Sequence, residues 1–129
     1  MRIFQALALA LAAMGCQAGE GEQAMTPATG EYRLTELDGA PFTARATIAF
    51  PAPDRVTGMA PCNRYFATQT ARHPAFSLIR IGGTRRACAE LDAERRFLTA
   101  LRAMTRIEVA GDTVVLTNEA GRRMVFSAP

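Results

Sequence analysis

The sequence contains no lysine and no tryptophan, and His73 is its single histidine. All 15 basic residues among the 129 are therefore arginines. Because arginine stays protonated at working pH, it supplies neither a Schiff-base amine nor a neutral general base, and lysine-dependent chemistry is excluded. One histidine and three cysteines also leave few ways to assemble a metal site or a catalytic triad. We therefore expect no cofactor and no metal.

The N-terminal apolar stretch is too short to cross a bilayer, which takes roughly 20 residues. It runs from Ile3 to Met14, is rich in alanine and leucine, and follows a positively charged start at Arg2. A charged start before a short apolar core is typical of a secretory signal peptide. We assign this signal peptide to residues 1–15.

The junction after this stretch, Ala13-Met14-Gly15-Cys16, resembles the bacterial lipobox, in which the cysteine carries the lipid of the mature protein. Several acyl chains on Cys16 would hold the protein at a membrane, since each buried methylene contributes about 0.8 kcal/mol. Gln17 follows the cysteine, with no aspartate there to favour inner-membrane retention. In a Gram-negative cell the resemblance indicates the outer membrane, facing the periplasm. The alternative is an ordinary cleaved signal and a free cysteine.

The remaining chain divides into a tether and one domain. Residues 16–30 are polar and small and show no apolar period, so we expect a flexible tether after the lipidated cysteine. Residues 31–129 are enough for a single hydrophobic core. The chain as a whole is 49% hydrophobic and 21% charged, as is ordinary for a globular protein.

Within the domain, short apolar runs alternate with turn signals, which predicts mostly β structure. Neighbouring strands are joined by short turns such as Asp38-Gly39 and residues 51–54, so they should be antiparallel. With one helix, this gives an α+β fold. Gly82-Gly83 is expected to end the fifth strand. The strands are expected at residues 32–37, 46–50, 55–58, 65–71, 76–81, 107–109, 114–116 and 124–126.

One helix is expected from Asp92 onward. Asp92 is the candidate N-cap, and Glu94 suits the positive end of the helix dipole. Arginines at 95, 96 and 102 should point away from the apolar face. That face is marked by apolar residues at helical spacing, namely Ala93, Phe97, Leu98, Leu101 and Met104.

Several segments, taken together and in order, carry a resemblance that covers nearly all of residues 30–129. They include Val56-Thr-Gly, Cys62-Asn63-Arg64-Tyr65-Phe66, Thr84-Arg85-Arg86-Ala87-Cys88, and Glu94 with Phe97-Leu98. This order resembles the META domain (HslJ-like) family. The resemblance implies a small antiparallel, partly open β-barrel with one helix packed across it. It also implies an association with heat shock, stress response, envelope proteins and virulence, with no settled catalytic activity.

Cys62 and Cys88 are the only cysteines left once Cys16 carries a lipid, so one internal pairing exists. Exported proteins meet an oxidising compartment, which favours a structural disulfide between them. Two free buried thiols and a reactive redox or metal site are the alternatives. A redox site usually has a close Cys-x-x-Cys motif, and a zinc site needs four ligands.

Other polar residues near these cysteines are candidates for a ligand site or a structural motif. Asn63, followed by Arg64, is expected to form a turn through its own main chain, with a ligand-contacting amide as the alternative. Arg85 is expected to pair with a buried carboxylate, stack on an aromatic ring or contact a ligand. His73 is expected to lie in a loop without a function, since a Cys–His pair would need a free thiol.

Residues 31–129 hold 14 arginines against 10 acidic residues, a net charge of +4. Export and the scarcity of aromatic residues argue against nucleic acid as a partner. An anionic lipid headgroup or an envelope polymer fits better, at roughly 1 kcal/mol per near-surface charge. A basic face that only contacts solvent is the simpler alternative.

These patterns predict a non-catalytic envelope lipoprotein, acting in envelope stress tolerance or as an accessory to other envelope proteins. Its membrane contact is the N-terminal lipid. The alternatives are a periplasmic carrier of a small apolar or acyl ligand, a protease-inhibitor-like module, and an enzyme.

Overall fold

The computed structural model describes residues 30–129. The predicted signal peptide, Cys16 and all but the last residue of the tether lie outside the described residues. Nine strands and one helix follow one another along this part of the chain. They are β1 (Glu31–Leu37), β2 (Ala40–Pro41), β3 (Thr47–Ala52), β4 (Arg55–Met59), β5 (Arg64–Gln69), β6 (Leu78–Gly83), α2 (Leu91–Ala103), β7 (Arg106–Ala110), β8 (Thr113–Thr117) and β9 (Arg123–Ser127).

All pairings between these strands are antiparallel, as the short turns predict. The order across the sheet is β6-β5-β4-β3-β1-β9-β8-β7, with β2 paired to β1. Alternate residues of β1, such as Tyr32 and Leu34, are buried while their neighbours are exposed, so one face of the sheet forms the core. The expected α+β class is confirmed.

The sheet is not closed, but its two ends approach each other at one point. Ala75, just before β6, forms an isolated bridge with Arg106 at the start of β7. The amide of Phe76 donates to the carbonyl of Thr105 at 2.9 Å, and the amide of Ile107 donates to the carbonyl of Pro74 at 2.9 Å. This seam gives the partly open barrel that the family resemblance implies.

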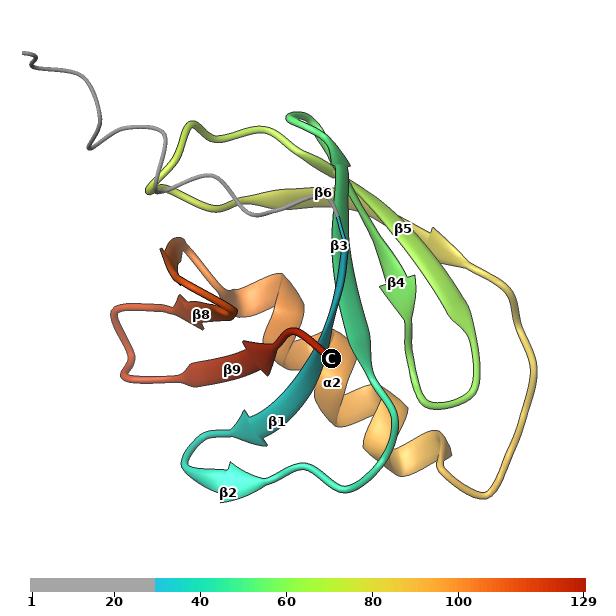
Figure 1. The fold of residues 1–129 in the computed structure, drawn as a ribbon. Coiled ribbons are helices and arrows are strands. Elements are labelled where there is room, and N and C mark those ends of the chain that lie inside the picture. Colours follow the sequence, from blue (N-terminus) through green and yellow to red (C-terminus); the bar gives the residue numbers. More distant parts are fainter. Residues whose placement is uncertain (1–29) are drawn as a thin grey trace, which may run out of the picture.

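The helix α2 fills the concave side of the curved sheet (Figure 1). Phe97 is fully buried at its centre. Its ring centroid lies 5.5 Å from that of Tyr65 on β5 and 6.4 Å from that of Phe126 on β9. One helix residue thus joins both halves of the sheet, and burying such a side chain contributes about 1.5–3 kcal/mol. No helix within residues 30–129 is long and apolar enough to cross a membrane.

The helix is confirmed, but it starts differently from the prediction. The N-cap residue is Glu90, which makes no side-chain cap hydrogen bond, so the expected Asp92 cap is wrong. Asp92 lies instead in the first turn, where it pairs with Arg95 at 3.4 Å. A carboxylate in this turn still suits the positive end of the helix dipole.

Two expected strand ends are also wrong. β3 runs through Pro51 to Ala52, so the turn starts later than Pro51. β6 does not stop before Gly82 but continues through it and ends at Gly83, and the two glycines pair with Phe66 and Tyr65 of β5. The reason is steric, because the Phe66 ring lies so close to Gly82 that a Cβ there would meet it at 2.9 Å.

The Asp38-Gly39 turn is confirmed between β1 and β2. Both residues have positive φ, +52° and +83°, which is the backbone geometry of a two-residue hairpin turn. Aspartate tolerates this region better than most residues, and glycine adopts it without steric cost.

Candidate functional site

Three segments that the sequence singled out meet beside the start of α2. They are the turn at Cys62–Arg64, the long connection that carries Thr84–Cys88, and the first turn of the helix at Glu94. The Cys62–Cys88 disulfide joins the first two, with a Cα–Cα distance of 5.6 Å. The expected pairing is confirmed.

Asn63 is the centre of this cluster, and its side chain is buried. Its Nδ2 donates to the carbonyl of Arg86 at 2.9 Å and to the Oε2 of Glu94 at 2.8 Å. Its Oδ1 accepts from the Oγ1 of Thr84 at 3.0 Å and from the amide of Arg86. The amide group thus uses its full capacity of two donors and two acceptor positions. From the sequence, the Asn63 side chain was expected to bond the main chain of its own turn. It bonds instead to Thr84 and Arg86 in the connection before α2, and to Glu94.

Glu94 is buried on the helix face that packs against this turn. Its Oε1 accepts from the backbone amides of Cys62 at 3.0 Å and Asn63 at 2.8 Å. With the bond from Asn63 Nδ2, the carboxyl group receives three hydrogen bonds from N–H donors. This is the kind of compensation that a buried carboxylate requires.

The cluster braces the domain and offers no reactive group. Within the described residues, every buried side-chain nitrogen and oxygen has a hydrogen-bond partner. Both thiols of residues 30–129 are in the disulfide, so a Cys–His pair with the exposed His73 is not formed there. No group of three or more metal-ligating side chains occurs among these residues.

Arg64 and Arg85 are exposed and belong to a different feature next to the cluster. A cavity of about 490 Å³ lies between β6 and the side of α2 that carries Glu94, Leu98 and Arg102, and we call it the β6–α2 cavity. Arg64, Arg85 and Arg102 line it, together with Phe66 and Leu98. Arg85 forms no ion pair within residues 30–129, so the alternative that it pairs with a buried carboxylate is wrong for this part of the chain.

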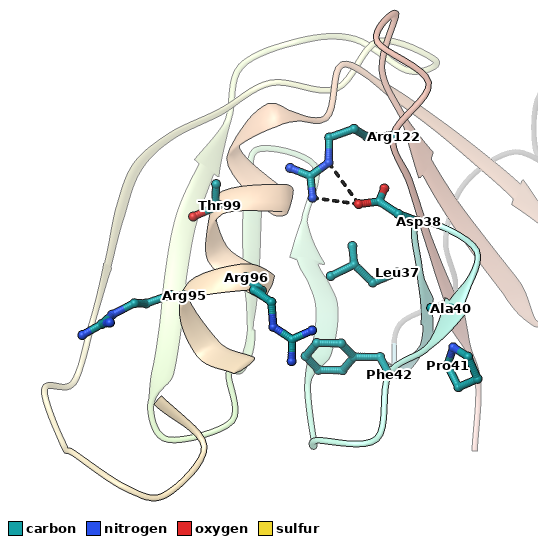
Figure 2. Close-up of a pocket in the computed structure, with 9 residues that line it drawn as sticks. All are labelled: Leu37, Asp38, Ala40, Pro41, Phe42, Arg95, Arg96, Thr99 and Arg122. Carbon is teal, nitrogen blue, oxygen red and sulfur yellow. Dashed lines mark hydrogen bonds and ion pairs between the residues drawn. The ribbon is translucent and has the colours of Figure 1, made fainter. Parts of the chain in front are cut away.

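A second hollow of about 360 Å³ lies between α2 and the β1–β2 hairpin, and we call it the hairpin groove (Figure 2). Arg122 and Arg96 in its lining already interact with other side chains of the protein. Arg122 donates to Oδ2 of Asp38 through Nη2 at 2.9 Å and Nε at 3.2 Å, and Arg96 lies 5.8 Å from the centre of the Phe42 ring. The Arg122 hydrogen bonds and the Arg123 amide lower the pKa of Asp38. These contacts hold the hairpin against the helix.

The family model of the META domain matches residues 23–129. The chain belongs to the META domain family. A search of curated proteins finds no match for it.

Two solved structures share the fold of this META domain. One is the NMR structure of a protein from Burkholderia xenovorans, with 20% identity, a TM-score of 0.62, and coverage of 98% of this chain and 96% of that one. The other is the crystal structure of a DUF4847 family protein from Bacteroides vulgatus, with 13% identity, a TM-score of 0.64, and coverage of 84% and 96%. At these identities the likeness concerns the fold alone.

Sequence reasoning on the META segments missed two things that the structure brings together. Glu94 has the same helical phase as Phe97 and Leu101, three and seven residues further on, and this spacing was the signal that it faces inward. The β6–α2 cavity had no comparable signal, because Arg64 and Arg102 lie far apart in the sequence.

Proposed function

We propose that this META-domain protein is an exported lipoprotein, anchored through Cys16 in the outer membrane and facing the periplasm. There its domain acts without catalysis, in envelope stress tolerance or as an accessory to other envelope proteins. The observation that carries the proposal is the Cys62–Cys88 disulfide, since such bonds persist in oxidising compartments and are rare in the cytosol.

Two further observations support it. The segment Ala13-Met14-Gly15-Cys16 has the lipobox pattern, and Cys16 is the one cysteine outside the disulfide. The polar cluster around Asn63 is fully hydrogen-bonded, which favours a structural role for it over a catalytic one. From Cys16 to Glu31 is 15 residues, so the anchor would keep the domain within about 50 Å of the membrane.

Replacement of the anchoring residue tests the proposal. We expect Cys16→Ser to move the protein from the membrane fraction to the soluble periplasmic fraction, because the acyl chains are lost. The matched control Ala18→Ser should stay with the membranes. Unchanged fractionation of Cys16→Ser, with no acyl mass on the wild-type N-terminal peptide, would overturn the anchor.

The stress role is tested in a strain that lacks the protein. Survival under heat and envelope stress should fall and should be restored by the wild-type protein. Restoration by Cys16→Ser to the same level would show that location at the membrane is not needed.

A further inference from the structure

The β6–α2 cavity holds an excess of positive charge over the part of the chain that the structure describes. Arg64, Arg85 and Arg102 line it, and none of them forms an ion pair within residues 30–129. Glu94 also lines it, so the formal charge of its lining is +2. Both oxygens of Glu94 already accept from the Cys62–Asn63 turn and are directed to that side. The hairpin groove differs, because there Arg122 is paired with Asp38.

The same cavity has an apolar part. Phe66, Ile81 and Leu98 contribute to its lining. Phe66 is 57% exposed and is one of two large hydrophobic residues left open to solvent in the described part of the chain. A volume of about 490 Å³ falls in the usual range for small-molecule sites, roughly 300–1,000 Å³.

The β6 side of the cavity is formed by main chain. Gly82 and Gly83 line it without side chains, and the place that a Cβ would take at Gly82 is filled by the Phe66 ring. At Gly83 a Cβ would lie 2.3 Å from the carbonyl oxygen of Arg64, so this glycine packs directly against the main chain of β5. The end of β6 is therefore fixed against the strand that carries Arg64 and Phe66.

We propose that the β6–α2 cavity binds the headgroup of an anionic phospholipid, with part of an acyl chain against its apolar lining. The guanidinium groups would donate to the phosphate oxygens, a pairing for which arginine is well suited. Phe66, Ile81 and Leu98 would contact the chain. The inference rests on the proposed envelope location, because that location supplies the lipid, but its test does not require the anchor.

The test uses the full chain with phosphatidylcholine vesicles that contain a small fraction of phosphatidic acid with a photoreactive acyl chain. After illumination, cleavage at arginine and mass mapping locate the label. We expect it on the peptides that hold the apolar lining, Tyr65–Arg72, Ile81–Arg85 and Phe97–Arg102. Because the vesicles are presented directly, labelling is measured whether or not Cys16 carries a lipid, so failure of the anchor and failure of this site are distinguishable.

Charge variants give the control. Arg85→Gln combined with Arg102→Gln should reduce labelling roughly 30-fold, since each near-surface arginine contributes a factor of about 5 to anionic lipid binding. In this variant the corresponding peptides are Ile81–Arg86 and Phe97–Arg106, because two cleavage sites are lost. Arg55→Gln removes an exposed arginine of β4 that does not line the cavity, and it should leave labelling unchanged. Both proteins should retain the wild-type melting midpoint, which shows that they fold.

Three results would overturn the inference. One is equal labelling of the same peptides by a photoreactive phosphatidylcholine, because its headgroup has no net charge. Another is unchanged labelling in the double arginine variant. The third is absence of label from these peptides in a protein that binds inorganic phosphate at millimolar concentration, which would mean that the site takes free phosphate and not a lipid.

Discussion

The Asn63 side chain joins three parts of the chain, and its contribution to stability is measurable. Asn63→Ala removes four hydrogen bonds and leaves the part-buried main-chain groups of Arg86 and the buried carboxyl group of Glu94 without this partner. Each unsatisfied buried group costs about 1–3 kcal/mol, so we expect the free energy of unfolding to fall by about 2–4 kcal/mol. Urea titration followed by circular dichroism measures it.

Asn118→Ala provides the comparison. The Asn118 side chain makes two hydrogen bonds, to the carbonyl of Ala103 at 3.1 Å and from the amide of Arg122 at 3.0 Å, and it is only half-buried. Its loss should cost about 1 kcal/mol. An equal loss of unfolding free energy in the two variants would contradict the larger contribution assigned to Asn63.

Tyr65 predicts how stability changes at alkaline pH. Its hydroxyl is buried and donates to the carbonyl of Thr47 at 2.6 Å, and burial raises its pKa well above the ordinary value of 10. Above about pH 10 the unfolded chain loses this proton while the folded chain keeps it. The free energy of unfolding should therefore fall by up to about 1.4 kcal/mol per pH unit beyond pH 10.

Tyr65→Phe tests this pH dependence. The variant should be less stable near neutral pH, because the carbonyl of Thr47 loses a donor, but it should lack the Tyr65 share of the alkaline decrease. The chain has no lysine, and arginine does not titrate in this range, so few other groups interfere. Tyr32 is present in both proteins and cancels in the comparison. Identical slopes in unfolding titrations at pH 9–11, the range around the ordinary tyrosine pKa, would refute the assignment.

At the residue scale, some contacts were predictable from the sequence and others were not. The Cys62–Cys88 pair was predictable because only two cysteines follow Cys16. The partners of Asn63 were not, since they depend on how the Thr84–Cys88 connection folds back. A polar side chain that joins distant segments leaves no periodic pattern in the sequence.

At the scale of the element, the stability of β6 depends on how closely it packs against β5. We expect Gly83→Ala to lower the free energy of unfolding by about 2–3 kcal/mol, because its Cβ would collide with the main chain of Arg64. Gly82→Ala should cost less than about 1 kcal/mol, because the exposed Phe66 ring it meets can rotate away. Thermal unfolding of the two variants, measured together, checks the order. The reverse order would mean that β5 and β6 are not fixed as described.

Strands with a clear alternation or a glycine turn were well predicted, and the exceptions have a physical cause. β6 contains a register shift, and Arg80 within it has a φ of +53°. Such a bulge disrupts the two-residue alternation, which is why Arg80 is exposed although the alternation of Phe76 and Leu78 predicted it on the inward face. The helix was predictable because its apolar period extends over the whole element.

At the scale of the whole molecule, the disulfide joins the turn after β4 to the connection that leads into α2. It closes a segment with a sequence separation of 26, which in the chain-entropy model contributes roughly 3–4 kcal/mol. We expect Cys88→Ala to lower the melting midpoint by more than about 10 °C, at some 4–8 °C per kcal/mol for this size. Calorimetry measures it, and Cys16→Ser, which leaves the disulfide intact, should keep the wild-type midpoint. A midpoint unchanged in Cys88→Ala would reject the bracing role.

The two edge strands of the sheet, β6 and β7, affect how readily copies of this protein aggregate. Exposed strand edges are templates on which a second chain can add its own strand, and this is a common start of aggregation. Here the outer edge of β7 is occupied by the segment around Ala75, and the outer edge of β6 carries a bulge with the charged Arg80. Neither edge offers a long, flat row of unpaired groups. The domain should therefore remain dispersed even at high local concentration, such as the proposed anchor would produce.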